Sequence, residues 1–149
     1  MRIKMENYME LKIPGKSQNE SFARVTVAAF ASQLDPTLEE LSDVKTAVSE
    51  AVTNAIVHGY VKEMGEILIK ARLRDNSLEV EVIDYGAGIE DIEKAREPLY
   101  TSKPELERSG MGFTIIDKFM DQLEITSETS RGTTVKMVKK IGKRNNSLN

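Results

Sequence analysis

Residues 37–59, TLEELSDVKTAVSEAVTNAIVHG, predict one long amphipathic helix, the element on which the rest of the predicted fold depends most. Its first four residues have the form of a capping box, in which a hydroxyl and a carboxylate bond the free amides at a helix start. Gly59 is a suitable helix stop. The apolar side chains in between follow helical spacing and predict a buried stripe: Leu41, Val44, Val48, Val52, Ala55 and Ile56.

Three polar side chains, Glu50, Asn54 and His58, recur every four residues beside this stripe. Mg²⁺ prefers oxygen ligands, so the Asn54 side-chain oxygen is a candidate direct ligand. Glu50, one turn earlier, could bind a metal-bound water or take a proton from an attacking hydroxyl. The alternative is an ordinary exposed Glu and Asn on a helix flank. A histidine near a helix end is more often a cap or a packed side chain, so His58 is assigned no catalysis.

A second motif, DYGAG at residues 84–88, follows the apolar strand pattern of residues 80–83. A carboxylate at a strand end, here Asp84, can accept a hydrogen bond from an adenine amino group. Gly86 and Gly88 leave room for a flat base and permit unusual backbone angles. Because Asp and Gly are common in turns, a simple turn is the alternative. A hydroxyl such as Thr133 near the base is plausible, although a plain strand residue is equally consistent.

A third motif, Ser109-Gly110-Met111-Gly112, precedes an apolar helical pattern. Free amides at such a helix start favour phosphate oxygens, and glycine lets the backbone approach closely. Four residues upstream could add to this site: Thr101, Ser102, Lys103 and Arg108. The alternative is a helix cap, and the Walker pattern is absent.

The remaining pattern predicts a two-layer α/β (α+β) sandwich with helices on one face of a mixed, mostly antiparallel sheet. The element order is strand, helix, helix, strand, strand, helix, strand, strand. We expect a strand at residues 9–13, a helix at 18–33 capped by Ser17 or Asn19, and a break at Asp35-Pro36. A hairpin at 67–82, a lid-like loop at 90–109, a helix at 113–120 and two strands within 123–137 follow.

Composition limits the classes of function. The 149 residues suit a single domain, here residues 1–141, with a polar tail at 142–149 expected to be disordered. There is no cysteine and one histidine, which excludes thiolate or multi-histidine metal sites. The net charge of -3 argues against a broad nucleic-acid surface, so no direct nucleic-acid partner is expected. With neither a signal peptide nor a membrane span in the sequence pattern, a cytoplasmic location is predicted.

Together these motifs and the late Gly-Thr-Thr at 132–134 resemble the boxes of the Bergerat (GHKL) ATP-binding superfamily. Three longer segments are similar to the anti-sigma F factors of that superfamily: NESFARVTVAAF at 19–30, SEAVTNAIVHGY at 49–60 and TSKPELERSGMGF at 101–113.

The resemblance implies an ATP-dependent protein serine kinase that also binds and inhibits the sporulation sigma factor F. Glu50 would then be the general base, and Asn54 would bind Mg²⁺. Asp84 would recognise adenine with Gly88 beside it, while the motif at 109–112 would hold the phosphates. The other nucleotide contacts would come from Gly86, Thr101, Ser102, Lys103, Arg108 and Thr133.

On the first helix, Glu20 and Arg24 would contact the sigma factor and an anti-anti-sigma protein, the serine substrate. ADP is the expected product, and the resemblance also implies a homodimer. Two alternatives stay open: a nucleotide-dependent binding module without kinase activity, and a detached histidine-kinase catalytic domain.

Overall fold

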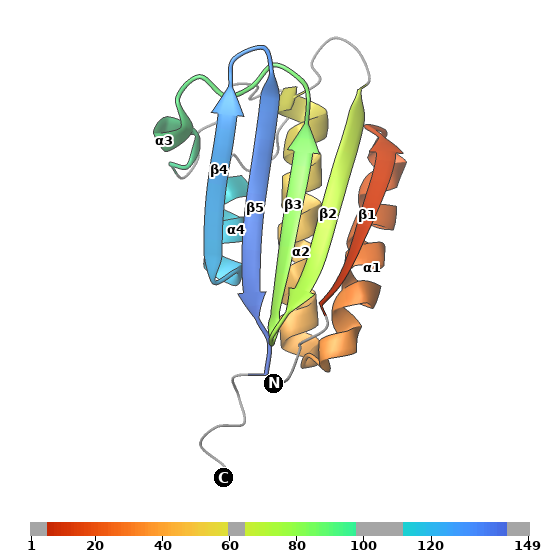
Figure 1. Cartoon of the computed structure of the whole chain (residues 1–149). Coiled ribbons are helices and arrows are strands. Elements are labelled where there is room, and N and C mark those ends of the chain that lie inside the picture. Colours follow the sequence, from red (N-terminus) through yellow and green to blue (C-terminus); the bar gives the residue numbers. More distant parts are fainter. Residues whose placement is uncertain (1–5, 60–64, 98–111, 143–149) are drawn as a thin grey trace.

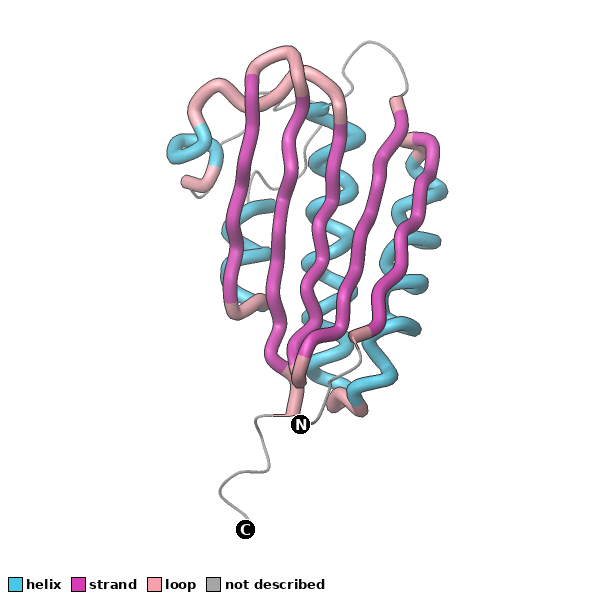
Figure 2. Tube along the Cα trace, viewed as in Figure 1, coloured by secondary structure: helices cyan, strands magenta, loops and turns pink. Residues whose placement is uncertain are grey.

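The computed structural model describes residues 6–59, 65–97 and 112–142, which form a sheet covered on one face by helices (Figures 1 and 2). The elements in chain order are β1 (Asn7–Pro14), α1 (Ser17–Ala31), α2 (Leu38–Asn54), β2 (Glu66–Arg74), β3 (Ser77–Asp84), α3 (Ile92–Ala95), α4 (Gly112–Phe119), β4 (Gln122–Glu128) and β5 (Gly132–Lys140). A 3₁₀ turn at Ser32–Leu34 follows α1, and a π-helical turn at Ala55–Gly59 extends α2. The predicted two-layer sandwich is confirmed.

The sheet has the strand order β1-β2-β3-β5-β4, and its four described pairings are all antiparallel. The expectation was a mixed, mostly antiparallel sheet, and its mixed part is wrong for the described strands, because β3 and β4, which point the same way, are not neighbours. Since β5 lies between them, β3 and β4 do not pair (Figure 1). The hairpin prediction is confirmed, with Asp75 in a left-handed conformation at the turn (φ 56°).

The core lies between the sheet and the three helices α1, α2 and α4. Alternate residues of β2 and β3 are buried, as the period of two predicts. From α2 the helical stripe contributes Val44, Val48 and Val52, each with no exposed surface. Burying a side chain of this size stabilises the fold by roughly 1.5–3 kcal/mol. The stripe therefore fixes which side of α2 faces the sheet and which side carries Glu50 and Asn54.

The start of α1 differs from the prediction. Lys16, rather than Ser17 or Asn19, occupies the N-cap position, and its side chain makes no capping hydrogen bond. The Asn19 side chain instead donates to the Pro14 carbonyl oxygen, 2.9 Å away, and ties the helix to the end of β1. The predicted break is present, since Asp35 is left-handed (φ 54°) before Pro36. For α2 the predicted capping box is present, with Thr37 and Glu40 bonding each other's backbone amides.

The outer face of the sheet carries one row of alternating charge across all five strands. The strand register aligns Glu10, Lys70, Glu81, Lys136 and Glu124 in that order. Opposite charges on directly facing strands stabilise their pairing, so the row favours this register over a slipped one.

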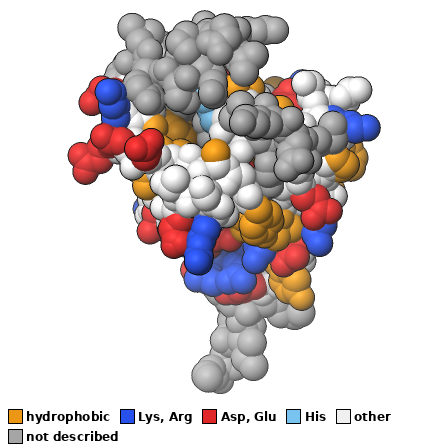
Figure 3. Space-filling view, turned by 90° about the horizontal axis from the view of Figure 1, so that it is seen from above, with side chains coloured by type: hydrophobic (Ala, Val, Ile, Leu, Met, Phe, Trp, Pro, Cys, Tyr) orange, Lys and Arg blue, Asp and Glu red, His pale blue; other side chains and the backbone are white. Residues whose placement is uncertain are grey.

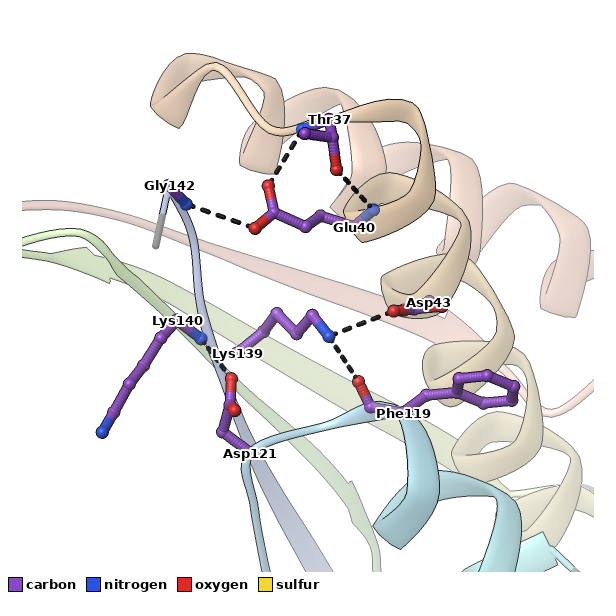
Figure 4. Close-up of polar contacts among 8 residues, drawn as sticks. All are labelled: Thr37, Glu40, Asp43, Phe119, Asp121, Lys139, Lys140 and Gly142. Atoms are coloured by element: carbon purple, nitrogen blue, oxygen red, sulfur yellow. Dashed lines mark hydrogen bonds and ion pairs between the residues drawn. The ribbon is translucent and has the colours of Figure 1, made fainter. Parts of the chain in front are cut away.

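A largely buried lysine on β5 bonds the first turns of α2 and the end of α4 (Figure 4). The Lys139 ammonium donates to the Asp43 carboxylate at 3.1 Å and to the Phe119 carbonyl at 2.7 Å. The Lys139 side chain is 14% exposed. Little water could therefore reach the Asp43 carboxylate and the Phe119 carbonyl to replace the ammonium as a hydrogen-bond donor. The cluster holds the end of α4 against the helix that carries Glu50 and Asn54.

We expect Lys139→Met to lower the free energy of unfolding by about 1–3 kcal/mol, because it leaves a half-buried carboxylate and a carbonyl without their donor. Urea denaturation measures this loss. The control is Lys140→Met, because the Lys140 side chain is exposed and only its backbone amide bonds Asp121. Equal losses in the two variants would contradict a specific role for Lys139.

Candidate functional site

The candidate site lies at the end of the molecule where α2 ends, β3 ends and β5 begins (Figure 1). Glu50 and Asn54 are half-buried on the last two turns of α2. His58 lies in the π-helical turn that follows, so the regular four-residue spacing does not extend to it. In Figure 3, which looks down on this end, uncharged surface lies between acidic and basic side chains.

A direct contact between Gly59 and the loop after β3 joins the first two motifs. A β-carbon on Gly59 would lie 2.8 Å from the Asp84 carboxyl carbon, so only glycine leaves room for this carboxylate. The Gly59 carbonyl accepts a hydrogen bond from the Ala87 amide at 2.8 Å. A β-carbon on Gly86 would lie 1.8 Å from that same carbonyl oxygen. Two glycines thus allow the π-helical turn and the DYGAG loop to pack directly on each other.

Asp84 is a buried carboxylate, 4% exposed. Burial raises the pKa of its side chain above the ordinary value of 3.8, and hydrogen bonds from the backbone amides of Gly86 and Thr133 partly offset the rise. The Gly86 amide donates to Asp84 Oδ1 at 3.0 Å. A buried acceptor at a strand end suits recognition of a ligand donor, and its cost to stability marks it as a functional candidate.

The loop after Asp84 is held by the β4–β5 turn. Gly88 has a φ of +79°, and a β-carbon there would lie 2.2 Å from the Glu128 carbonyl oxygen. The Ser130 amide donates to the Ala87 carbonyl at 2.6 Å, and the Ile89 amide donates to Ser127 Oγ at 2.7 Å. Of the two glycines expected to permit unusual backbone angles, Gly88 takes a positive φ and Gly86 does not.

Thr133 lies opposite Asp84 in the β3–β5 pairing and is buried. Its hydroxyl is 2.9 Å from Ser127 Oγ, which in turn donates to the Gly132 carbonyl at 3.0 Å. The structure therefore places Thr133 beside the carboxylate, within a hydroxyl pair that also fixes the DYGAG loop.

The third motif is described only at its last residue, Gly112, which begins α4. The other predicted phosphate contacts lie outside the described residues: Thr101, Ser102, Lys103, Arg108, Ser109, Gly110 and Met111. The part of the predicted lid that is described contains the short helix α3, capped by the Asp91 side chain.

The predicted partner-binding residues form an ion pair on α1. Arg24 Nη1 lies 2.7 Å from Glu20 Oε2, and the same oxygen accepts the Ser49 hydroxyl at 2.5 Å. Ser49 directly precedes Glu50 on α2. The structure thus links the predicted partner surface to the helix of the first motif.

The side-chain oxygens of Glu50 and Asn54 fit a hard cation such as Mg²⁺ that is held mainly by the phosphates of a nucleotide. The described residues hold no group of three or more His, Cys, Asp or Glu arranged for a metal ion. The predicted Mg²⁺ site needs fewer protein ligands than such a group, since Mg²⁺ is commonly held by one or two protein oxygens with phosphates and water. Asn54 offers an amide oxygen, and Glu50 adds a carboxylate one turn away.

Three contributions were missed by sequence reasoning: the fit of Gly59 to Asp84, the Ser127 hydroxyl, and the Ser49 hydroxyl. Gly59 was interpreted only as a helix stop. Ser127 lies on an alternating strand pattern where a serine is unremarkable, so its role depends on the strand register. A serine on a long helix likewise carries no signal of its own.

Known proteins are similar to this chain in sequence and in fold. Residues 14–139 match the family model for the histidine kinase-like ATPase domain. The anti-sigma F factor of Clostridium acetobutylicum is 63% identical over 136 residues, covering 91% of this chain and 95% of that protein. The one from Caldanaerobacter subterraneus subsp. tengcongensis is 58% identical over 141 residues, covering 95% and 99%.

Solved structures share the fold at low identity. One contains the RsbU and RsbW domains of a Mycobacterium tuberculosis protein, with a TM-score of 0.66, 17% identity, and coverage of 91% of this chain and 32% of that one. The other is a blue-light activated histidine kinase of Erythrobacter litoralis, with a TM-score of 0.61, 19% identity, and coverage of 84% and 42%. Within the described ranges, no helix has the length and apolar character needed to cross a membrane.

Proposed function

Because the chain belongs to the histidine kinase-like ATPase domain family, and within it to the anti-sigma F factors, we propose that it binds and inhibits sigma factor F. We further propose that it uses ATP to phosphorylate a serine of an anti-anti-sigma protein. The proposal covers one domain at residues 1–141 and a polar tail at 142–149, acting in the cytoplasm.

One structural observation supports the proposed nucleotide site most directly. The contact of Gly59 with the buried Asp84 carboxylate brings the helix of Glu50 and Asn54 to the loop predicted to bind adenine. The two motifs are separated by the whole of β2 and most of β3 in the chain. Their meeting at one end of the sheet supports a single nucleotide site.

Each group has a role that its position supports. Asp84 accepts a hydrogen bond from the adenine amino group. Gly86, Gly88 and Thr133 shape the space beside the base. Asn54 holds Mg²⁺, which neutralises phosphate charge when bound. Glu50 accepts the proton of the attacking serine hydroxyl.

The remaining nucleotide contacts complete the proposal. Phosphate oxygens meet the amides at the start of α4, and ADP is the product. This arrangement includes Gly112 and the motif residues before it, Ser109, Gly110 and Met111. Thr101, Ser102, Lys103 and Arg108 contribute donors from the lid segment.

Partner binding is assigned to α1. A homodimer, as the family resemblance implies, presents two copies of this helix to one sigma factor. Beside Arg24 the helix exposes Phe22 and Val25, at 53% and 56% of their surface. Exposed apolar side chains next to a charged anchor are typical of a protein contact.

The test of the proposed function is incubation with labelled ATP, the anti-anti-sigma protein and sigma factor F. Acid-stable label on a serine of the anti-anti-sigma protein is expected. Absence of label together with nucleotide-dependent sigma binding would indicate a binding module instead. Acid-labile label on a partner histidine would indicate a detached histidine-kinase domain.

Arg24→Ala is expected to weaken sigma-factor binding by roughly 30-fold, the effect of removing an interface arginine worth about 2 kcal/mol. Isothermal titration calorimetry with ATP present measures it. Arg131→Ala is the matched control, since Arg131 also pairs with a nearby glutamate, Glu128, but lies on the β4–β5 turn. Unchanged affinity of the Arg24 variant would rule out the contact.

A further inference from the structure

The carboxylate of Glu20 is shared between two helices. Its Oε2 atom accepts from Arg24 Nη1 at 2.7 Å, four residues along α1, and from Ser49 Oγ at 2.5 Å on α2. All three side chains are partly buried, with 35% of the Arg24 side chain and 21% of the Glu20 side chain exposed. Ser49 is therefore the group that fixes the ion pair to the body of the protein.

The Ser49 bond matters because the ion pair alone is a weak constraint. An ion pair between residues four apart on one helix contributes little, since two long side chains lose rotamer freedom to form it. A second bond from another helix restricts Glu20 to one rotamer, and Arg24 then has one favoured position. Holding a binding group in place before the partner arrives lowers the entropy lost on binding.

We propose that Ser49 is a positioning residue for the partner surface, acting through Glu20 to hold Arg24 ready for the partner protein. The proposal rests on the proposed function, because it takes Arg24 as a contact to sigma factor F. Ser49 itself touches neither nucleotide nor partner in this proposal. Its effect therefore belongs to partner affinity and not to the chemical step.

The experiment compares Ser49→Ala with Ser42→Ala in calorimetric titrations with sigma factor F in the presence of ATP. Ser42 lies two turns earlier on α2 and is exposed. Because both variants replace a helical serine by alanine, the gain in helix propensity is the same in each. We expect the Ser49 variant to bind threefold to tenfold more weakly, about the effect of one net hydrogen bond, and Ser42→Ala to bind as wild type. Ser49→Thr, which keeps the hydroxyl, should recover most of the affinity.

Two further readouts distinguish positioning from a general structural role. The KM for the anti-anti-sigma protein should rise by a similar factor, while kcat and the affinity for ATP stay at wild-type values. In a background in which both Glu20 and Arg24 are replaced by alanine, Ser49→Ala should add less than twofold, because the groups that it positions are gone.

Wild-type affinity in Ser49→Ala would overturn the inference and leave the proposed function intact. So would a full additional loss in the background that lacks both Glu20 and Arg24, or a fall in kcat with unchanged KM. If the wild-type protein fails to bind sigma factor F at all, both the inference and the proposed function are wrong.

Discussion

Glu50→Gln is expected to slow phosphoryl transfer to the partner serine by about 10²–10⁴-fold, the usual contribution of a general base. The substitution keeps the size and the hydrogen-bonding oxygen of the side chain but removes its ability to accept a proton. Glu50 is half-buried on the last turns of α2, so the neutral amide should be accommodated without a change in fold. Because phosphoryl transfer depends heavily on positioning and charge neutralisation, the lower end of the range is the better expectation.

Single-turnover transfer of labelled phosphate measures this rate, with ATP binding and sigma-factor binding measured in parallel. Both binding affinities should stay close to wild type. Glu39→Gln serves as the control, since Glu39 is an exposed glutamate on the first turn of the same helix. Kinase activity retained in the Glu50 variant would exclude this residue as the base.

Asp84→Asn is expected to weaken ATP binding by roughly 10- to 100-fold, the effect of losing a hydrogen bond to a charged group. The amide oxygen can still accept from the Gly86 amide, so the loop should keep its structure. Calorimetry or a fluorescent nucleotide analogue measures the affinity. Asp75→Asn, in the hairpin turn at the other end of β3, should bind ATP normally.

The same variant should not lose stability, and its pH dependence should differ from wild type. Burial raises the pKa of Asp84 in the folded state above 3.8, so folding favours the protonated form. Asp84 therefore contributes a loss of stability to the wild-type protein as the pH rises from 3.8 through the raised pKa, and this contribution is absent from Asp84→Asn. Near neutral pH the variant should be at least as stable as wild type in urea denaturation. Lower stability together with weaker ATP binding would indicate a structural role for Asp84 instead.

Much of the fold and of the site could be predicted because it depends on residues close together in the chain. The capping box of α2 depends on Thr37 and Glu40, three residues apart. The positive φ of Gly88 was likewise expected from a glycine after a strand. The predicted N-cap of α1 was wrong although the contacts are local, since Lys16 occupies the N-cap position and the Asn19 side chain donates instead to the carbonyl of Pro14, five residues earlier.

The two-layer sandwich, the amphipathic helix with Glu50 and Asn54, and the family could all be predicted from the chain, because periodicity and short motifs reflect interactions within a few residues. Two contacts became visible only in the folded protein: Gly59 packs against Asp84, and Ser49 ties Glu20 and Arg24 to the helix of Glu50. These contacts join residues 25 and 29 positions apart. Their distances depend on how α1 and α2 pack on each other and on the sheet, which no local pattern in the chain specifies.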